Sequence, residues 1–185
     1  MKRLATLFTQ SYQEIRHVRT ITICAMFGAL SVVLGYFTLD LGPSLKLGFS
    51  GIPNRLVDYL FGPVAGGVYG GVLDVLKYIA KPTGPFFPGF SLNAMLAGVL
   101  FGSIMYRRPL TLRRVLAAKL AVVLVCNVLL NTLWLSMLYG KAFTVLLPLR
   151  LFKNLIMWPV DSLLFFSVGQ VLERGGVFRA IRRGA

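Results

Sequence analysis

The sequence predicts an all-α integral membrane protein, a single domain of six transmembrane helices with both termini in the cytoplasm. Two observations lead to this prediction. Of the 185 residues, 56% are hydrophobic and only 14% are charged, and the mean hydropathy is +0.73, whereas soluble domains carry roughly a quarter charged residues. Several apolar stretches also reach the roughly 20 residues that a bilayer core requires.

The individual helices follow from long stretches with few charges. The windows 20–39, 82–106 and 120–140 contain none, and 154–172 contains only Asp161. The apolar stretch 50–80 is interrupted by Gly62-Pro63, a dipeptide that marks a boundary, so we expect two shorter or tilted helices there. The expected helices span 20–39, 51–62, 64–80, 91–106, 115–138 and 149–172, between an N-terminal cytoplasmic segment 1–19 and a cytoplasmic tail 173–185.

Positive charge sets the expected orientation. Twelve of the twenty Lys and Arg residues lie in the segments 1–19, 107–114 and 173–185, which six spans place on one side of the membrane. By the positive-inside rule, that side is the cytoplasm. The net charge of +14 is therefore explained by topology and contact with anionic lipids, and it does not indicate nucleic acid binding.

A second set of cations maps to the opposite, extracytoplasmic half, which topology alone would not produce. Ionisable groups in a bilayer usually face a bundle interior or a cavity. Seven cations there outnumber four carboxylates, and this surplus of three positive charges suggests an anionic ligand. The cations are Lys46, Arg55, Lys77, Lys81, Lys141, Arg150 and Lys153, and the carboxylates are Asp40, Asp58, Asp74 and Asp161.

Polar residues at helical spacing predict faces that line a common site. The pairs Asp58–Arg55 and Asp74–Lys77 could instead neutralise one another within a helix, and Asn side chains can simply join helices. Both interpretations stay open at this point. The stripes are Asp74, Lys77, Tyr78 and Lys81; Arg150, Asn154, Trp158 or Met157, and Asp161; Asn127, Asn131 and Trp134; and Arg55 with Asp58.

Two outer loops rich in Gly and Pro, 39–50 and 81–90, favour a gated pocket, because proline makes a loop stiff. The second loop carries Phe86, Phe87 and Phe90. These rings could form a lid that stacks on a planar ligand. Partial insertion into the lipid headgroups is the alternative.

Small residues form a close-packing face on the first expected helix, at Ala25, Gly28 and Ala29. A run of glycines between 66 and 71 forms another. Such faces either pack within the bundle or dock another membrane subunit. The only histidine is His17 and no phosphate-binding loop is present, so we expect neither an enzyme, nor a metal site, nor hydrolysis of ATP by this chain.

One continuous segment, 46–102, carries a family resemblance. It reads KLGFSGIPNRLVDYLFGPVAGGVYGGVLDVLKYIAKPTGPFFPGFSLNAMLAGVLFG. It resembles the folate-specific substrate-binding subunit, or S component, of energy-coupling factor (ECF) vitamin transporters. The resemblance implies a six-helix vitamin receptor of the bacterial plasma membrane that captures folate at the outer surface, with no cofactor. It also implies a transmembrane scaffold (T) subunit and two cytosolic ATPases as partners in an ABC-type importer, with Ala25 and Ala29 in the scaffold-docking motif.

A folate ligand implies roles for the polar stripes. Its pterin ring presents an amide N–H and an amino group side by side, which one carboxylate can accept together. The glutamate tail brings two carboxylates for cations to meet. The pterin candidates are Asp74, Asp161, Asn93, Asn131 and Asn154, with Trp134, Trp158 and Phe90 stacking on the ring; the tail candidates are Lys46, Lys77, Lys81 and Arg150.

Two other functions remain in view. The chain could be an S component for another vitamin, such as pantothenate or riboflavin. More remotely, it could be a membrane enzyme that uses Asp74 and Asp161 as acid and base. The sequence does not specify the oxidation state of folate that is preferred.

Overall fold

The computed structural model describes residues 2–40, 46–81, 86–139 and 143–182, and it is predominantly helical. Five of its helices are long and apolar enough to cross a membrane, so the predicted helical membrane fold is confirmed. The elements are α1 (Lys2–Ile15), α2 (Val18–Tyr36), β1 (Thr38–Asp40), β2 (Lys46–Gly48), α3 (Gly51–Ala80), α4 (Pro88–Met105), α5 (Leu112–Val122), η1 (Val123–Leu130), α6 (Asn131–Tyr139), α7 (Phe143–Arg174) and α8 (Val177–Arg182).

Several elements depart from the expected helix bounds. The N-terminal segment is itself helical, as α1. The helix expected at 91–106 begins earlier, at Pro88, where a proline is favourable because the first helical N–H has no partner. Between α2 and α3, the strands β1 and β2 pair antiparallel, which an all-helical prediction does not contain. The pairing gives the extended backbone of the connection its hydrogen bonds.

The helix α3 is a hairpin of two antiparallel segments. A Cβ placed on Gly66 would lie 3.3 Å from the Cα of Asp58, although residues eight apart in a straight helix are separated by about 12 Å. Likewise, the Tyr69 hydroxyl lies 3.4 Å from Oδ1 of Asn54. The reversal occurs at Gly62, whose φ of 87° and ψ of −169° are not helical. With the hairpin counted as two, six apolar segments cross the bundle.

A side chain from α1 closes this reversal. The Ser11 hydroxyl donates to the Phe61 carbonyl at 2.6 Å. The same oxygen accepts the backbone N–H groups of Val64 at 3.0 Å and Ala65 at 3.2 Å. One buried serine therefore satisfies the end of the first segment and the start of the second, which would otherwise have unpaired backbone groups.

Glycines let the second segment of α3 approach α4 closely. A Cβ on Gly98 would collide with the Gly66 carbonyl, and one on Gly102 would come within 2.8 Å of the Gly62 carbonyl carbon. Close backbone approach through small residues is a common way for helices to associate in lipid. The α3 glycines thus pack within the bundle, which resolves one of the two alternatives left by the sequence.

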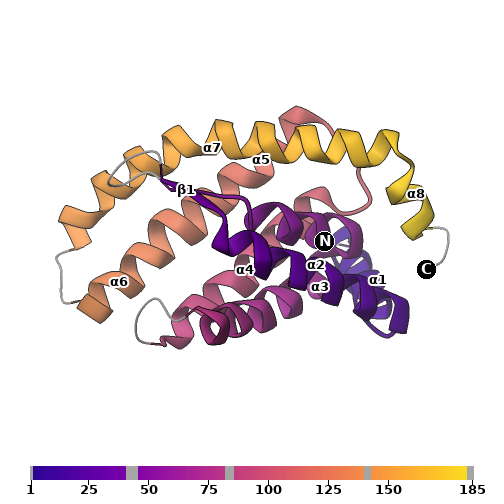
Figure 1. Ribbon diagram of the computed structural model, residues 1–185, viewed down its shortest axis with the longest axis horizontal. Coiled ribbons are helices and arrows are strands. Elements are labelled where there is room, and N and C mark those ends of the chain that lie inside the picture. Colours follow the sequence, from indigo (N-terminus) through magenta and orange to yellow (C-terminus); the bar gives the residue numbers. More distant parts are fainter. Residues whose placement is uncertain (1, 41–45, 82–85, 140–142, 183–185) are drawn as a thin grey trace.

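The segments near the two chain ends lie at the same end of the bundle. Figure 1 shows α1 and α8 together at the right, and the end of α6 and the start of α7 at the left. The Arg19 guanidinium donates to the Ala180 carbonyl at 3.0 Å, which ties α2 to α8. Tyr106 lies between α4 and α5, and its hydroxyl donates to Oε1 of Glu14 in α1 at 3.4 Å. Burial raises the pKa of this phenol. Placement of this end in the cytoplasm stays a prediction.

Candidate functional site

A cavity of about 650 Å³ opens among α2, α3, α4, η1 and α6. This volume is typical of a site for a vitamin-sized molecule. The polar and aromatic residues that line it are Tyr36, Ser50, Arg55, Asp74, Lys77, Tyr78, Lys81, Phe86, Phe87, Phe90, Asn93, Asn127 and Asn131.

The charged wall of the cavity comes from the α3 hairpin. Oδ2 of Asp74 accepts a hydrogen bond from the Ser91 hydroxyl at 2.7 Å, so that this carboxylate is fixed against α4. The Arg55 guanidinium lies 2.7 Å from Oδ2 of Asp58, which is 2% exposed. Because the hairpin folds back, Arg55 from its first segment and Lys77 from its second line the same cavity. A straight α3 would hold them far apart.

Two buried polar atoms near the cavity have no hydrogen-bond partner among the residues that the structure describes, namely Oδ1 of Asn93 and Nε1 of Trp134. Buried polar atoms are nearly always paired, and an exception needs an explanation. Asn93 lines the cavity, so a bound molecule can supply the missing donor to its Oδ1.

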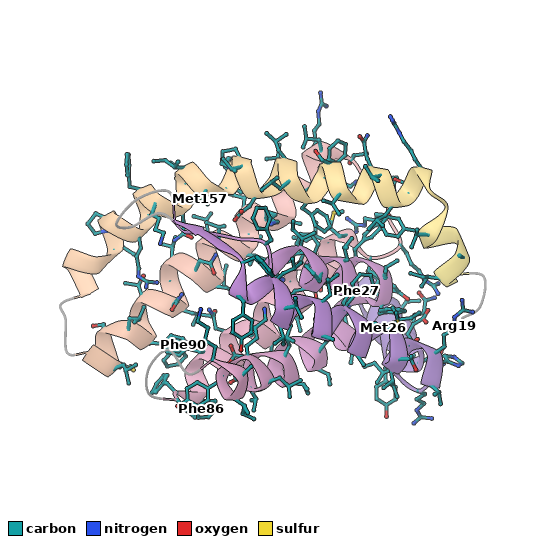
Figure 2. The ribbon with its side chains drawn as sticks, viewed as in Figure 1. Arg19, Met26, Phe27, Phe86, Phe90 and Met157 are labelled. Atoms are coloured by element: carbon teal, nitrogen blue, oxygen red, sulfur yellow. The ribbon has the colours of Figure 1, made fainter. Side chains whose placement is uncertain are left out.

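Aromatic side chains gather where α4 begins. The Phe87 ring lies 5.8 Å from that of Phe90 and 5.6 Å from that of Trp134. The rings of Tyr78 and Phe86 lie 5.1 Å apart. Figure 2 labels Phe86 and Phe90 at the lower left, and Arg19 at the opposite end of the molecule. The cavity therefore has an aromatic rim at the end distant from the two termini.

A second, smaller cavity of about 90 Å³ lies between the two segments of α3. Asn54, Asp58 and Tyr69 line it, together with Arg55 and Lys77, which also line the main cavity. Its lining is polar, so it is suited to ordered water. The small cavity extends the polar wall of the main one into the hairpin.

Half of the twelve predicted ligand-site residues meet in the main cavity. Asp74, Asn93, Asn131, Phe90, Lys77 and Lys81 line it. Among the other described side chains, those of Asp161, Asn154, Trp134, Trp158 and Arg150 lie outside it. The side chain of Lys46 lies outside the described residues. For all of these residues, contact with a ligand stays a prediction.

Three of the residues outside the cavity, Trp158, Asn154 and Asp161, have other partners. The Trp158 indole N–H donates to the Leu116 carbonyl at 3.0 Å, and the Asn154 amide donates to the Arg150 carbonyl at 2.9 Å. Asp161 interacts electrostatically with Lys119. In this structure Trp158 and Asp161 turn toward α5, so the polar stripe of α7 does not line the main cavity beside that of α3. Contact of this stripe with a ligand stays a prediction.

Seven polar or aromatic residues that line the cavity are absent from the pterin and tail candidates, namely Tyr36, Ser50, Arg55, Tyr78, Phe86, Phe87 and Asn127. Helical spacing places Arg55, Tyr78 and Asn127 in the predicted polar stripes, and Phe86 and Phe87 belong to the predicted aromatic lid. No signal in the sequence places Tyr36 at the cavity.

An apolar groove of about 720 Å³ runs between α2 and the second segment of α3. The predicted docking residues Ala25, Gly28 and Ala29 all line it, as do Cys24 and Tyr69. Figure 2 labels Met26 and Phe27 on the same helix, near the middle of the molecule. The small-residue face of α2 therefore leaves a groove open, whereas the glycines of α3 are covered by α4.

Comparison with known protein families matches residues 19–169 to the substrate-specific component of ECF transporters. The chain belongs to this family. An ECF substrate-specific component is a multi-pass membrane transport subunit, so the chain is not an enzyme, and the resemblance noted in the sequence is confirmed.

Relatives of this ECF substrate-specific component include folate transporters. A protein of Clostridium novyi, named folate transporter FolT, is 32% identical over 86% of this chain and 93% of its own length. Another FolT, of Leuconostoc mesenteroides, is 30% identical over 77% of this chain and 80% of its own. A riboflavin transporter, RibU of Staphylococcus aureus, is 26% identical over 84% of this chain and 93% of its own.

A solved structure, described as FolT bound with folic acid, has a TM-score of 0.74 to this ECF substrate-specific component. It is 32% identical in sequence, and the match covers 83% of this chain and 94% of the solved one. The arrangement of helices that encloses the main cavity is thus shared with a protein crystallised with folic acid.

Proposed function

We propose that this chain is the folate-binding subunit of an ECF-type importer, which captures folate at the outer face of the bacterial plasma membrane. The likeness to a solved FolT bound with folic acid, at 32% identity and a TM-score of 0.74, carries the proposal. The chemistry of the main cavity supports it, because aromatic rings, a carboxylate and lysines surround one space.

For the pterin ring we propose Asp74, Asn93, Asn131 and Phe90. Oδ2 of Asp74 is held by Ser91, so the carboxylate is oriented before the ligand arrives and can accept the adjacent amide and amino hydrogens. Oδ1 of Asn93 has no partner and suits a further donor of the pterin. Phe90 offers a ring face for stacking.

For the glutamate tail we propose Lys77 and Lys81. Both line the main cavity; Lys77 lies in the last turn of α3, and Lys81 is the residue that follows the end of this helix. The Lys81 ammonium lies 5.5 Å above the Tyr36 ring, which holds it beside the cavity through a cation–π interaction. Two ammonium groups so placed match the two carboxylates of the tail.

The partners in this proposal are a transmembrane scaffold subunit and two cytosolic ATPases, which hydrolyse ATP and drive folate into the cytoplasm. We assign scaffold docking to the groove at Ala25, Gly28 and Ala29. The groove is apolar, and Ala25 and Ala29 are exposed on the side of α2 that lipid would otherwise cover. An apolar helix of the scaffold fits such a face, because small residues permit close approach.

Riboflavin is the second candidate ligand, because a riboflavin transporter is 26% identical to this chain. A flavin ring is planar and would also suit the aromatic rim. Isothermal titration of the purified, detergent-solubilised protein with folate, riboflavin and pantothenate separates the candidates. We expect folate to bind at submicromolar concentration and the other two not to bind. Binding of riboflavin without folate would overturn the proposal.

A further inference from the structure

We propose that Tyr69 and Asn54 couple the apolar groove to the ligand cavity, so that occupation of one changes the affinity of the other. The inference rests on the proposed function, because it takes the groove as the docking face and the main cavity as the folate site. It adds the residues that connect the two.

The connection is a buried polar junction of three helical segments. Oδ1 of Asn54, in the first segment of α3, lies 2.7 Å from the Ser31 hydroxyl of α2 and 3.4 Å from the Tyr69 hydroxyl of the second segment. Ser31 is fully buried, and its hydroxyl also lies 2.8 Å from the Ser50 carbonyl. The single hydroxyl proton of Ser31 is shared between the Ser50 carbonyl and Oδ1 of Asn54, so Oδ1 of Asn54 also depends on the Tyr69 hydroxyl as a donor.

Tyr69 forms the wall between the groove and the hairpin interior. Its side chain lines the apolar groove and also the small polar cavity. A Cβ on Gly28, the central residue of the docking face, would be 3.7 Å from the Tyr69 ring. A helix that binds in the groove therefore contacts the Tyr69 ring, which lines it. The Tyr69 hydroxyl points to the small polar cavity, toward Asn54.

Displacement of Tyr69 reaches the ligand cavity in two steps. Protein interiors are close-packed, so a ring that moves carries its hydroxyl with it. Asn54 then loses a donor, and a buried acceptor left short of a donor is unfavourable. Asn54 precedes Arg55 in the chain, and Arg55 lines both the small cavity and the main cavity. The proposed coupling therefore requires a second arrangement of the junction, in which Tyr69 is not bonded to Asn54 as it is in this structure.

If the apolar groove and the ligand cavity are coupled, the coupling is reciprocal, so binding of folate must also change the conformation of the groove. Cys24 lines the groove and reports on it, while Cys126 is fully buried and can be removed as Cys126→Ala. In that background, the rate of Cys24 alkylation by a maleimide is measured on detergent-solubilised protein with and without saturating folate. We expect folate to change the rate by about five-fold or more, the lower end of ordinary coupling.

The decisive variant is Tyr69→Phe, which keeps the ring and removes the hydroxyl. We expect its alkylation rate to change with folate by less than about two-fold, because most of the coupling of the unaltered chain is lost. The matched control is Tyr59→Phe, which removes a buried hydroxyl 3.3 Å from the Arg108 carbonyl, on the same helix but outside both cavities. Ser31→Ala, which removes the other donor to Asn54, is the second variant.

Two results would overturn the inference while the proposed function stands. One is a Cys24 rate that does not respond to folate in protein that binds folate. The other is a response in Tyr69→Phe and Ser31→Ala as large as in Tyr59→Phe. Failure of the unaltered protein to bind folate would instead overturn the proposed function, and the coupling with it.

Discussion

The Ser11 hydroxyl donates a 2.6 Å hydrogen bond to the Phe61 carbonyl, across fifty positions of sequence. It joins α1, which lies in the segment that the sequence predicts as cytoplasmic, to the turn on which the α3 hairpin depends. Since the hairpin brings Arg55 and Lys77 to one cavity, a contact at one end of the bundle supports the ligand site toward the other.

Replacement of Ser11 by alanine is expected to destabilise the protein by about 1–3 kcal/mol, because the backbone groups at the reversal lose the buried hydroxyl that pairs with them. Thermal unfolding of the detergent-solubilised protein measures the change. The matched control is Ser103→Ala, since that hydroxyl donates at 2.7 Å to Val99 within its own helix. An equal, small shift for both variants would mean that Ser11 does not hold the turn.

Replacement of Gly62 by alanine is expected to be more severe, about 3 kcal/mol or more, since two unfavourable effects combine. Its φ of 87° is rarely adopted by residues with a side chain, and a Cβ would lie 2.9 Å from both the Ser11 hydroxyl and the Tyr106 ring. The comparison is Gly35→Ala in α2, where a Cβ meets nothing within 4 Å. That variant should be neutral or slightly stabilising, and unfolding midpoints that rank the two in the opposite order would refute this account of the reversal.

Lys77→Gln is expected to weaken folate binding by about 10-fold or more, because a charge-assisted hydrogen bond to the glutamate tail is lost. The same variant should leave the binding of pteroate, which lacks that tail, within about two-fold. Arg150→Gln serves as the matched control, since Arg150 does not line the cavity. Titration of both ligands into the three proteins gives the comparison, and equal losses for folate and pteroate would remove Lys77 from the tail.

Asp74→Asn should weaken folate and pteroate alike, by about 10-fold or more, because an amide cannot accept both pterin donors as a carboxylate does. Ser91→Ala is expected to have a smaller effect in the same direction, since it frees the carboxylate that Ser91 holds at 2.7 Å. A loss confined to folate would place Asp74 away from the pterin.

How much of this site the sequence predicted depended on which helix carried the residue. On α3, the spacing of Asp74, Lys77 and Lys81 predicted a common face, and all three line the cavity. On α7, the same kind of spacing predicted that Trp158 and Asp161 share a face, and in the structure this face turns toward α5 and not toward the main cavity. Periodicity identifies the residues that share a face of a helix. It does not identify the helix toward which that face turns.

The reversal at Gly62-Pro63 shows the same limit at the level of the backbone. The dipeptide predicted an interruption between two helices, and the break lies there. Nothing local predicted that Ser11 would close it, because the contact joins residues fifty positions apart and depends on where α1 packs. The α2 and α3 small-residue faces read alike in sequence, and only the packing of α4 on one of them distinguishes an internal contact from an open groove.

Ala25→Leu is expected to stop folate uptake by cells that contain the scaffold and ATPase subunits, while the purified subunit keeps its affinity for folate within about three-fold, a small change on the scale of ordinary coupling. Ala25 lines the groove and is exposed, so a larger side chain there meets the partner rather than the interior of this chain. Small-to-large changes at a close helix contact prevent the approach on which association in lipid depends.

The control for this variant is Ala117→Leu, which adds the same atoms at an exposed position of α5 outside the groove. Uptake measured with radiolabelled folate should be unchanged for that variant. A loss of both uptake and binding in Ala25→Leu would identify the α2 face as internal packing. Unchanged uptake would place the scaffold on another surface, because a leucine in the groove cannot leave a close helix contact undisturbed.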